Sequence, residues 1–337
     1  AAAFSVSLSG GTPIAVAGAG AYSENVINST TSALIEGADL DVEGDVTVAA
    51  SNAASIQALV VAASLSFAGG ANSAVGASIG ISVARNYMGK ERDGTSAASG
   101  VSAEIVDSRV DAEGALAVSA TSTQTIEAMV VAGSVAIAAG GGNGISVAGS
   151  GVVVLNEIDY DVRAAISGDD GGASPAVSAA SITVDADDAS AISSLAAAVA
   201  VTGAFSGSAS VAVSLGVSVA MNTIEGVTEA VIEDVNGLEA ETGLVRVEAT
   251  DEGAIFSLSA AAAISFAVGG AAGVSIAGAG AWSENTILSD VRALVDGSDV
   301  DAASDVLVRA ESSGDVTALV ASVAFALGVG GTAGVAP

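Results

Sequence analysis

The sequence predicts an all-β protein, a repeat β-solenoid whose wide, β-helix-like coils hold about 65 residues and four strands each. Two segments, AVAGAGAYSEN at 15–25 and SIAGAGAWSEN at 275–285, are nearly identical although they lie 260 positions apart. Apolar residues make up 51% of the chain but aromatic residues only 3%, so small side chains must build the core. A chain that repeats itself and cannot bury its apolar strands within one unit must stack unit on unit.

Asparagine marks the register of the repeat. One asparagine ends an apolar run in each unit, and the successive spacings are 61, 70, 66 and 63 residues. A buried asparagine at one position of every coil can link its side-chain amide to its copies along the axis. We therefore expect a structural ladder rather than a ligand site, made of Asn25, Asn86, Asn156, Asn222 and Asn285.

The array is expected to fill the whole chain as a single continuous domain. Glycine-rich turns place the repeats at approximately 12–70, 71–141, 142–206, 207–270 and 271–331, with partial repeats at both ends. Neither end carries the polar cap that a solenoid needs to stay soluble. We therefore expect either a piece of a longer array or ends that dock on identical subunits.

The four strands follow one another in a fixed order within each unit. The first, such as 56–70, and the second, which runs from the glycine turn to the asparagine, are apolar or small on both faces. That pattern is typical of strands covered on both sides. The third, such as 32–42, and the fourth, such as 44–51, alternate with period two, so Val46 and Val48 should face the core.

Two alternatives compete with this fold. Helices are the rival structure for the alanine-rich runs, but glycine and β-branched valine recur through them and both are disfavoured in helix interiors. The second alternative is an array of stacked antiparallel β-hairpins, because the first two strands of a unit could pair across their glycine turn.

Charge and composition exclude several functions. The chain has 38 acidic and 8 basic residues, a net charge of −30, and neither cysteine nor histidine. Disulfides, thiolate zinc sites and thiol or imidazole catalysis are therefore excluded, and a nucleic-acid partner is disfavoured. Apolar runs such as 132–155 contain a glycine break and lack aromatic or basic flanks, so we expect no membrane span. We expect no enzyme activity, no catalytic residues and no organic cofactor.

Acidic turns supply the one candidate metal site. Carboxylates at alternate positions of a strand share one face, and calcium prefers such oxygen clusters. The spacing of known calcium-binding loops is absent, so a solvated acidic face is the competing interpretation. The candidate ligands are Asp39, Asp41, Asp299 and Asp301.

Two polar insertions interrupt the repeats. One holds Asp169, Asp170 and Pro175, and the other, at 89–100, holds Lys90, the single lysine of the chain. Insertions of solenoid repeats emerge as loops on one side, where contacts are often made. Surface loops without a contact are the competing interpretation.

The strand pattern AxAxGxSxAxN and the strand pair AxIxGaxVxaxGdVxVxA resemble the giant acidic Ala/Val/Gly-rich tandem-repeat proteins of bacterial cell surfaces, the adhesin or haemagglutinin-like β-solenoid class. The resemblance covers the whole chain and implies an extracellular, cell-surface location. It implies a filament or stalk subunit whose partner is a further copy or a longer parent array. The alternative is an adhesin segment that binds a surface or glycan in a calcium-dependent way. The resemblance carries no catalytic or binding residues to this chain.

Overall fold

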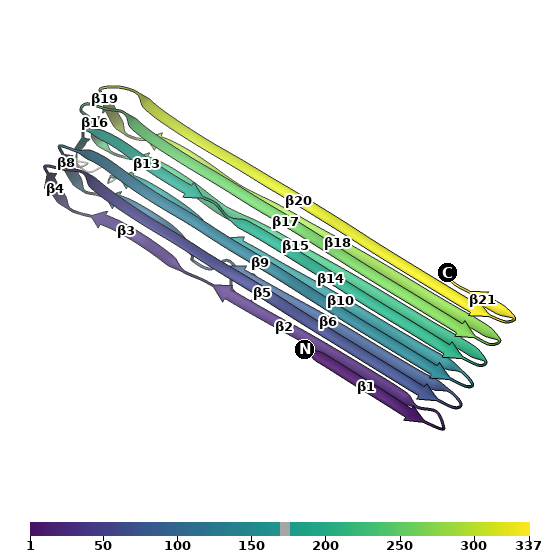
Figure 1. Cartoon of the computed structure of the whole chain (residues 1–337). Coiled ribbons are helices and arrows are strands. Elements are labelled where there is room, and N and C mark those ends of the chain that lie inside the picture. Colours follow the sequence, from purple (N-terminus) through teal and green to yellow (C-terminus); the bar gives the residue numbers. More distant parts are fainter. Residues whose placement is uncertain (169–175) are drawn as a thin grey trace.

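The computed structural model of the chain is a stack of long, parallel strands (Figure 1). It describes residues 1–168 and 176–337. In these two ranges there is no helix, and the strands pair in parallel. One isolated antiparallel bridge joins Lys90 to Ser96. The prediction of an all-β fold is confirmed at this level, and the parallel sheets are those of a solenoid-like structure.

The strands form three sheets, and one circuit of the chain through them is called a coil here. Sheet A contains β1 (Ala2–Ser9), β5 (Val46–Gly70), β9 (Ala115–Gly140), β13 (Ser181–Asp188), β14 (Ala191–Ser206), β17 (Val245–Gly269) and β20 (Val306–Gly330). Sheet B contains β2 (Ile14–Ile27), β3 (Thr30–Glu36), β6 (Ala74–Met88), β7 (Gly100–Val106), β10 (Gly144–Asp159), β11 (Asp161–Ser167), β15 (Ala209–Glu233), β18 (Ala272–Asp296) and β21 (Ala333–Val335). Sheet C contains β4 (Asp39–Val42), β8 (Arg109–Ala112), β12 (Val177–Ala179), β16 (Asn236–Ala240) and β19 (Asp299–Ala302).

The division of a coil into strands differs from the predicted one. The segments 44–51 and 56–70 were expected as separate strands, but β5 contains most of the first and all of the second. The residues between them include no glycine or proline, and the side chain of Asn52 donates across the coil to Tyr160, so the chain stays extended. The segment 32–42 is split instead, because Gly37 adopts a left-handed φ of 59° between β3 and β4.

Parallel pairing also removes the hairpin alternative. In each coil the strand before the glycine turn lies in sheet A and the strand after it lies in sheet B. These two strands therefore stack face to face and exchange no ladder hydrogen bonds with each other. Each pairs with its equivalent in the next coil, as Val46 does with Leu116 and Gly144 with Ser210.

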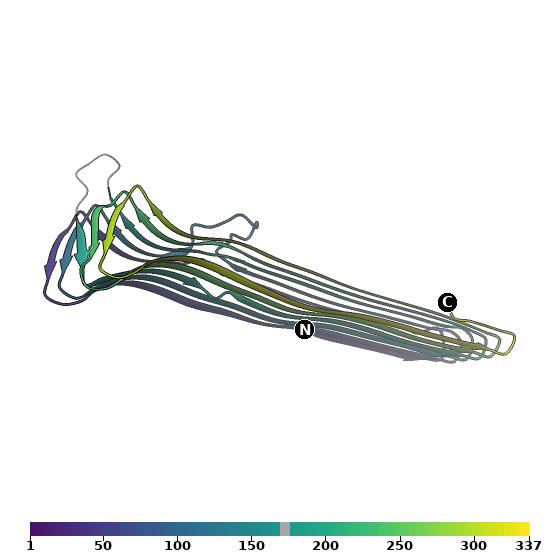
Figure 2. The ribbon, with the colours of Figure 1, turned by 90° about the horizontal axis from the view of Figure 1, so that it is seen from above.

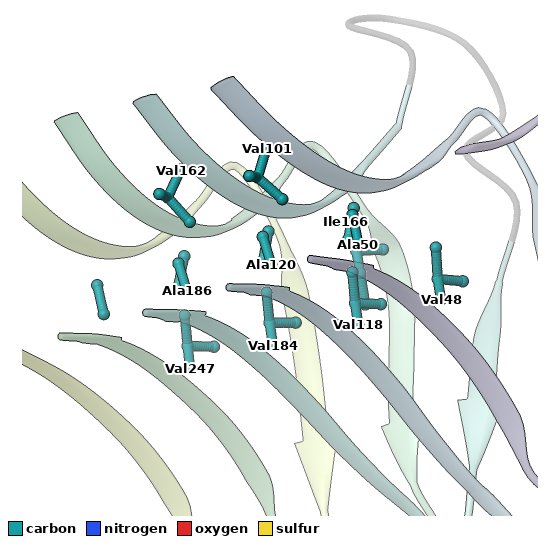
Figure 3. Close-up of a cluster of buried hydrophobic side chains, with 14 of the residues drawn as sticks. Val48, Ala50, Val101, Val118, Ala120, Val162, Ile166, Val184, Ala186 and Val247 are labelled. Carbon is teal, nitrogen blue, oxygen red and sulfur yellow. The ribbon is translucent and has the colours of Figure 1, made fainter. Parts of the chain in front are cut away.

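The wider end of the molecule, called the head, has three sides and a core of branched side chains (Figure 2). Val118, Val184 and Val247 lie one above another on neighbouring strands of sheet A, and they are fully buried (Figure 3). Val48 lies in the same row, as its alternation with polar residues predicts, and Val46 is partly buried. Burial of a valine side chain stabilises a fold by about 1.5–3 kcal/mol, so this ladder is a large contribution to the hydrophobic core of the head.

Beyond the asparagines the coil flattens into two layers, called the blade here (Figure 2). Its interior contains mostly alanine, serine and glycine, with buried valines such as Val130 and Val154 near the asparagines, and the two sheets come very close. A Cβ placed on Gly80 would lie 2.6 Å from the carbonyl oxygen of Gly133, and one on Gly216 would lie 2.7 Å from that of Ala262. The small-residue composition is thus explained by the thin blade.

Glycine turns close the coils at the tip of the blade. An added Cβ on Gly207 would overlap the carbonyl oxygen of Gly141, and one on Gly270 would overlap that of Gly207. The turns therefore stack with backbone against backbone. Neighbouring coils can keep their spacing of about 4.8 Å there only if these positions carry no side chain.

The blade strands were expected to be covered on both sides, and this is wrong. Their inward residues are buried, but the outward residues alternate with them and are exposed, as Leu59 and Ile79 show. Nothing in the described chain lies over either outer face. On a blade strand, the apolar residues of one face are therefore buried between the two sheets, and those of the other face are exposed to solvent.

Candidate functional site

The five asparagines lie at equivalent positions of neighbouring strands in sheet B and form one chain of side-chain hydrogen bonds. Nδ2 of Asn25 donates to Oδ1 of Asn86 at 2.7 Å, and Asn86 donates in the same way to Asn156 at 2.7 Å. The chain continues from Asn156 to Asn222 and from Asn222 to Asn285, with 2.8 Å for each bond. All four bonds run in the same direction along the stack.

The environment of the ladder is buried and polar. Asn86, Asn156 and Asn222 are buried completely or nearly so. The second Nδ2 hydrogen of Asn222 points across the coil, and this nitrogen lies 2.9 Å from Oγ of Ser194 in sheet A. The ladder therefore joins neighbouring coils and also joins the two layers where the head narrows into the blade.

The candidate calcium ligands do not come together. Asp39 and Asp41 lie on β4, whereas Asp299 and Asp301 lie on β19, at the opposite edge of sheet C. All four are exposed. Oδ1 of Asp39 already accepts a 3.0 Å hydrogen bond from Arg109. The two pairs therefore cannot share one ion.

A row of polar side chains nevertheless crosses sheet C. Strand register aligns Asp41 with Asp111, then with a serine on β12, Glu239 and Asp301. Arg109 bridges Asp39 and Asp111 and so neutralises part of the row. In the described part of the chain no group of three or more histidine, cysteine, aspartate or glutamate side chains is arranged to hold a metal ion. Sheet C presents an acidic, solvated face.

Two buried carboxylates lie inside the head, and the sequence analysis missed them. Asp188 on β13 and Asp251 on β17 pair in register, and each is only 4% exposed. Burial raises the pKa of Asp188 to about 6, and it also raises the pKa of Asp251. The alternation of inward and outward residues along the strand could have revealed Asp188. It is four residues after the buried Val184 and therefore shares its inward face.

The insertion with the single lysine makes a cross-coil contact. Nζ of Lys90 lies 2.8 Å from a carboxylate oxygen of Glu225 and 3.7 Å from one of Glu157. Burial lowers the pKa of Lys90, but the hydrogen bond and the charge of Glu225 outweigh it, so the net shift is upward. The lysine thus fastens the loop to two later coils. The other insertion, with Asp169, Asp170 and Pro175, lies outside the described residues.

Charge is strongly segregated along the coil. The blade carries no charged side chain, so its two outer faces are apolar. Leu59, Met129 and Phe256 are exposed on sheet A, and Ile79 and Leu215 on sheet B. In residues 1–168 and 176–337, the acidic and basic residues are therefore gathered in the head and next to the asparagines. The blade and its tip lie within the uncharged segments 1–23, 58–84, 128–156, 189–224, 253–283 and 316–337.

Comparisons with protein families, curated proteins and solved structures find no match to this chain. Among the described residues there is no helix that is long and apolar enough to cross a membrane. The described structure combines a directional amide ladder, an acidic head and two bare apolar faces.

Proposed function

We propose that the chain is a structural segment of an extracellular, cell-surface filament or stalk, in which tandem units of about 65 residues stack end to end as β-coils. The direction of the asparagine chain carries the proposal. Each amide nitrogen donates to the oxygen of the next asparagine in sequence order. A further coil beyond Asn285 would extend this chain of hydrogen bonds by offering its own Oδ1. Successive units would then stack in the same orientation along the axis, as an open array that does not close into a ring.

The sheet edges support the same arrangement. Within the described chain, sheet A ends on β1 and β20, and each of these strands pairs on one side only. A long, flat strand with free backbone N–H and C=O groups is a template for another strand. The same geometry serves a next coil from the same polypeptide and one from another copy.

The work of such a segment is mechanical. Neighbouring coils are joined by parallel backbone ladders and by one hydrogen bond between asparagine side chains, which is buried in the middle of the stack. The acidic head keeps a long rod hydrated and apart from its neighbours, because net charge far from zero opposes association. Added salt should therefore favour assembly, since it screens the repulsion between heads.

Electron microscopy of the purified protein tests the proposal. We expect rods of one coil's cross-section whose length grows with protein and salt concentration, and fibre diffraction with a spacing of about 4.8 Å along the rod axis. The variant Asn285→Asp keeps an oxygen for Asn222 but has no amide to donate to a further coil, so its rods should be shorter. Asn72→Asp adds the same charge in an exposed turn and should leave rod length unchanged.

Two results contradict the proposal. One is a chain that remains a single particle in microscopy at every salt and protein concentration. The other is a population of Asn285→Asp rods as long as those of the unaltered protein.

A further inference from the structure

The outer face of sheet B in the blade has a regular relief. Strand register places Gly18, Ile79, Gly149, Leu215 and Gly278 side by side on five successive coils. The next outward row repeats the pattern with Gly20, Ile81, Gly151, Val217 and Gly280. Large residues therefore stand on the second and fourth coils, and notches without side chains lie on the first, third and fifth.

The fold itself does not require these glycines, except at Gly278, where an added Cβ would lie 3.0 Å from Cδ2 of Leu215. A Cβ added to Gly18, Gly20, Gly149, Gly151 or Gly280 would meet no atom within 4 Å. None of these residues has a positive φ. Glycine in a strand costs about 0.5–1 kcal/mol relative to alanine, and it often marks a place where another backbone approaches. The contacts within a single chain therefore do not explain why glycine occupies these positions.

The residues between the notches have no partner in the described chain either. Ile79 and Ile81 are 55% and 50% exposed, and Leu215 and Val217 are 52% and 51% exposed. Tyr22 and Trp282 carry the polar atoms of this outer face at one end of the notches. An uncharged apolar patch of this extent on a soluble protein marks an interaction surface.

We propose that the outer face of sheet B binds the same face of a second copy of this chain, with the isoleucines and Leu215 of each copy seated in the glycine notches of the other. Large residues and notches alternate from coil to coil along the stack. If the second copy is shifted along the stack by one coil relative to the first, each large residue lies opposite a notch. A second copy supplies large side chains at the spacing of the notches, whereas a fluid lipid surface has no fixed relief that would fit them.

The size and charge of the face agree with this occupant. Five strands about 4.8 Å apart and ten residues long at about 3.3 Å each cover about 800 Å². That is the area per partner in a stable protein–protein interface, about 800 Å². The two blades should run antiparallel, because the acidic heads then lie at opposite ends of the face, about 33 Å apart, well beyond the screening length of about 8 Å.

This lateral pairing is distinct from the end-to-end stacking proposed above, and the test separates them. It uses the full chain with Asn285→Asp, which weakens the end contact and leaves the outer face of sheet B in the blade unaltered. Sedimentation over a concentration series should show dimers. Adding Gly149→Val and Gly151→Val fills one notch and should weaken the dimer at least tenfold, without lowering the melting temperature.

Gly133→Val is the matched control. Gly133 lies on the outer face of sheet A, where an added Cβ likewise meets nothing within 4 Å. This variant should dimerise like its parent. The chain has no cysteine, so single cysteines report the geometry cleanly. A mixture of Gly149→Cys and Ile81→Cys chains should be joined by a short bis-maleimide reagent, and a mixture of Gly149→Cys and Leu59→Cys chains should not.

Several outcomes would overturn the proposal. One is a chain that sediments as a monomer throughout. Another is an unchanged dimer after both notch substitutions, or equal cross-linking of the two cysteine mixtures. Binding of phosphatidylcholine vesicles that is lost with Gly149→Val and Gly151→Val, by a chain that stays monomeric in their absence, would assign the face to lipid instead.

Discussion

Nδ2 of Asn156 donates a 2.8 Å hydrogen bond to Oδ1 of Asn222, and both side chains are buried. The two residues are 66 positions apart in sequence but occupy the same position on neighbouring coils. The contact fixes the register of sheet B, because a slip of one residue would turn every inward side chain outward.

Replacing a central member of the ladder should be costly. Asn156→Ala leaves the amide nitrogen of Asn86 and the amide oxygen of Asn222 buried without a partner, at about 1–3 kcal/mol for each group. The urea midpoint of unfolding should fall accordingly. Asn72→Ala removes an exposed turn asparagine and is the control. Equal midpoints for the two variants would show that the ladder does not contribute to stability.

Stability should depend on pH through Asp188. Burial raises its pKa from 3.8 to about 6, and Ser122, Ser190 and Asp251 face it. The folded state therefore binds more protons than the unfolded state between these values, so stability falls as pH rises through this window. The loss amounts to about 2–3 kcal/mol.

Asp188→Asn tests that dependence directly. The amide keeps the shape of the carboxyl group but cannot ionise, so the variant should be more stable than the parent at pH 7 and similar to it near pH 4. The check is the melting temperature measured across this range. Asp41→Asn alters an exposed carboxylate and should not change the profile. A parent protein that gains stability from pH 5 to pH 7 would contradict the assignment.

The lysine contact should stabilise the loop at 89–99. Lys90→Met removes the cation between Glu157 and Glu225 and leaves two neighbouring carboxylates, at a cost of about 1–3 kcal/mol. We expect a lower urea midpoint, partly restored by salt, and faster proteolysis within the loop. Arg92→Ala removes a guanidinium that pairs with Glu24 but is 80% exposed, and it should cost less than about 1 kcal/mol. Similar effects of both substitutions would argue against a special role for Lys90.

Inward and outward glycines of sheet B should respond oppositely to alanine. At Gly216 the new methyl group would lie 2.7 Å from the carbonyl oxygen of Ala262, so Gly216→Ala should destabilise the fold by about 1–3 kcal/mol. At Gly149 the methyl group meets nothing, and Gly149→Ala should stabilise the folded chain by about 0.5–1 kcal/mol. Thermal unfolding of the two variants at low protein concentration decides the matter, and a reversed order would contradict the thin, two-layered blade.

Much of the fold can be predicted from the sequence, because it depends on local patterns that repeat. Period-two alternation around Val48 predicts an inward face, and the asparagine spacing predicts which residues become neighbours. The glycine-rich runs predict turns. These inferences need no knowledge of how the sheets are arranged, since each depends on what one unit must do to stack on the next.

Other features follow only from the three-dimensional arrangement. The sequence shows that the strand at 56–70 is apolar on both faces, but it does not show that one face packs on sheet B and the other stays bare. It also does not show that Asp188 is buried, because that burial depends on the strands that pack around it in the head.

The sequence by itself determined that the chain is an all-β array of stacked units, and which asparagines meet along the axis, whereas the choice between parallel strands and stacked hairpins came from the structure. The tertiary structure decided what lies across the axis: three sides in the head, two layers in the blade, and charge at one end only. The physical reason is that different interactions set the neighbours in the two directions. Neighbours along the stack are set by hydrogen bonding between identical positions, whereas neighbours across it depend on side-chain volumes contributed by different parts of each coil.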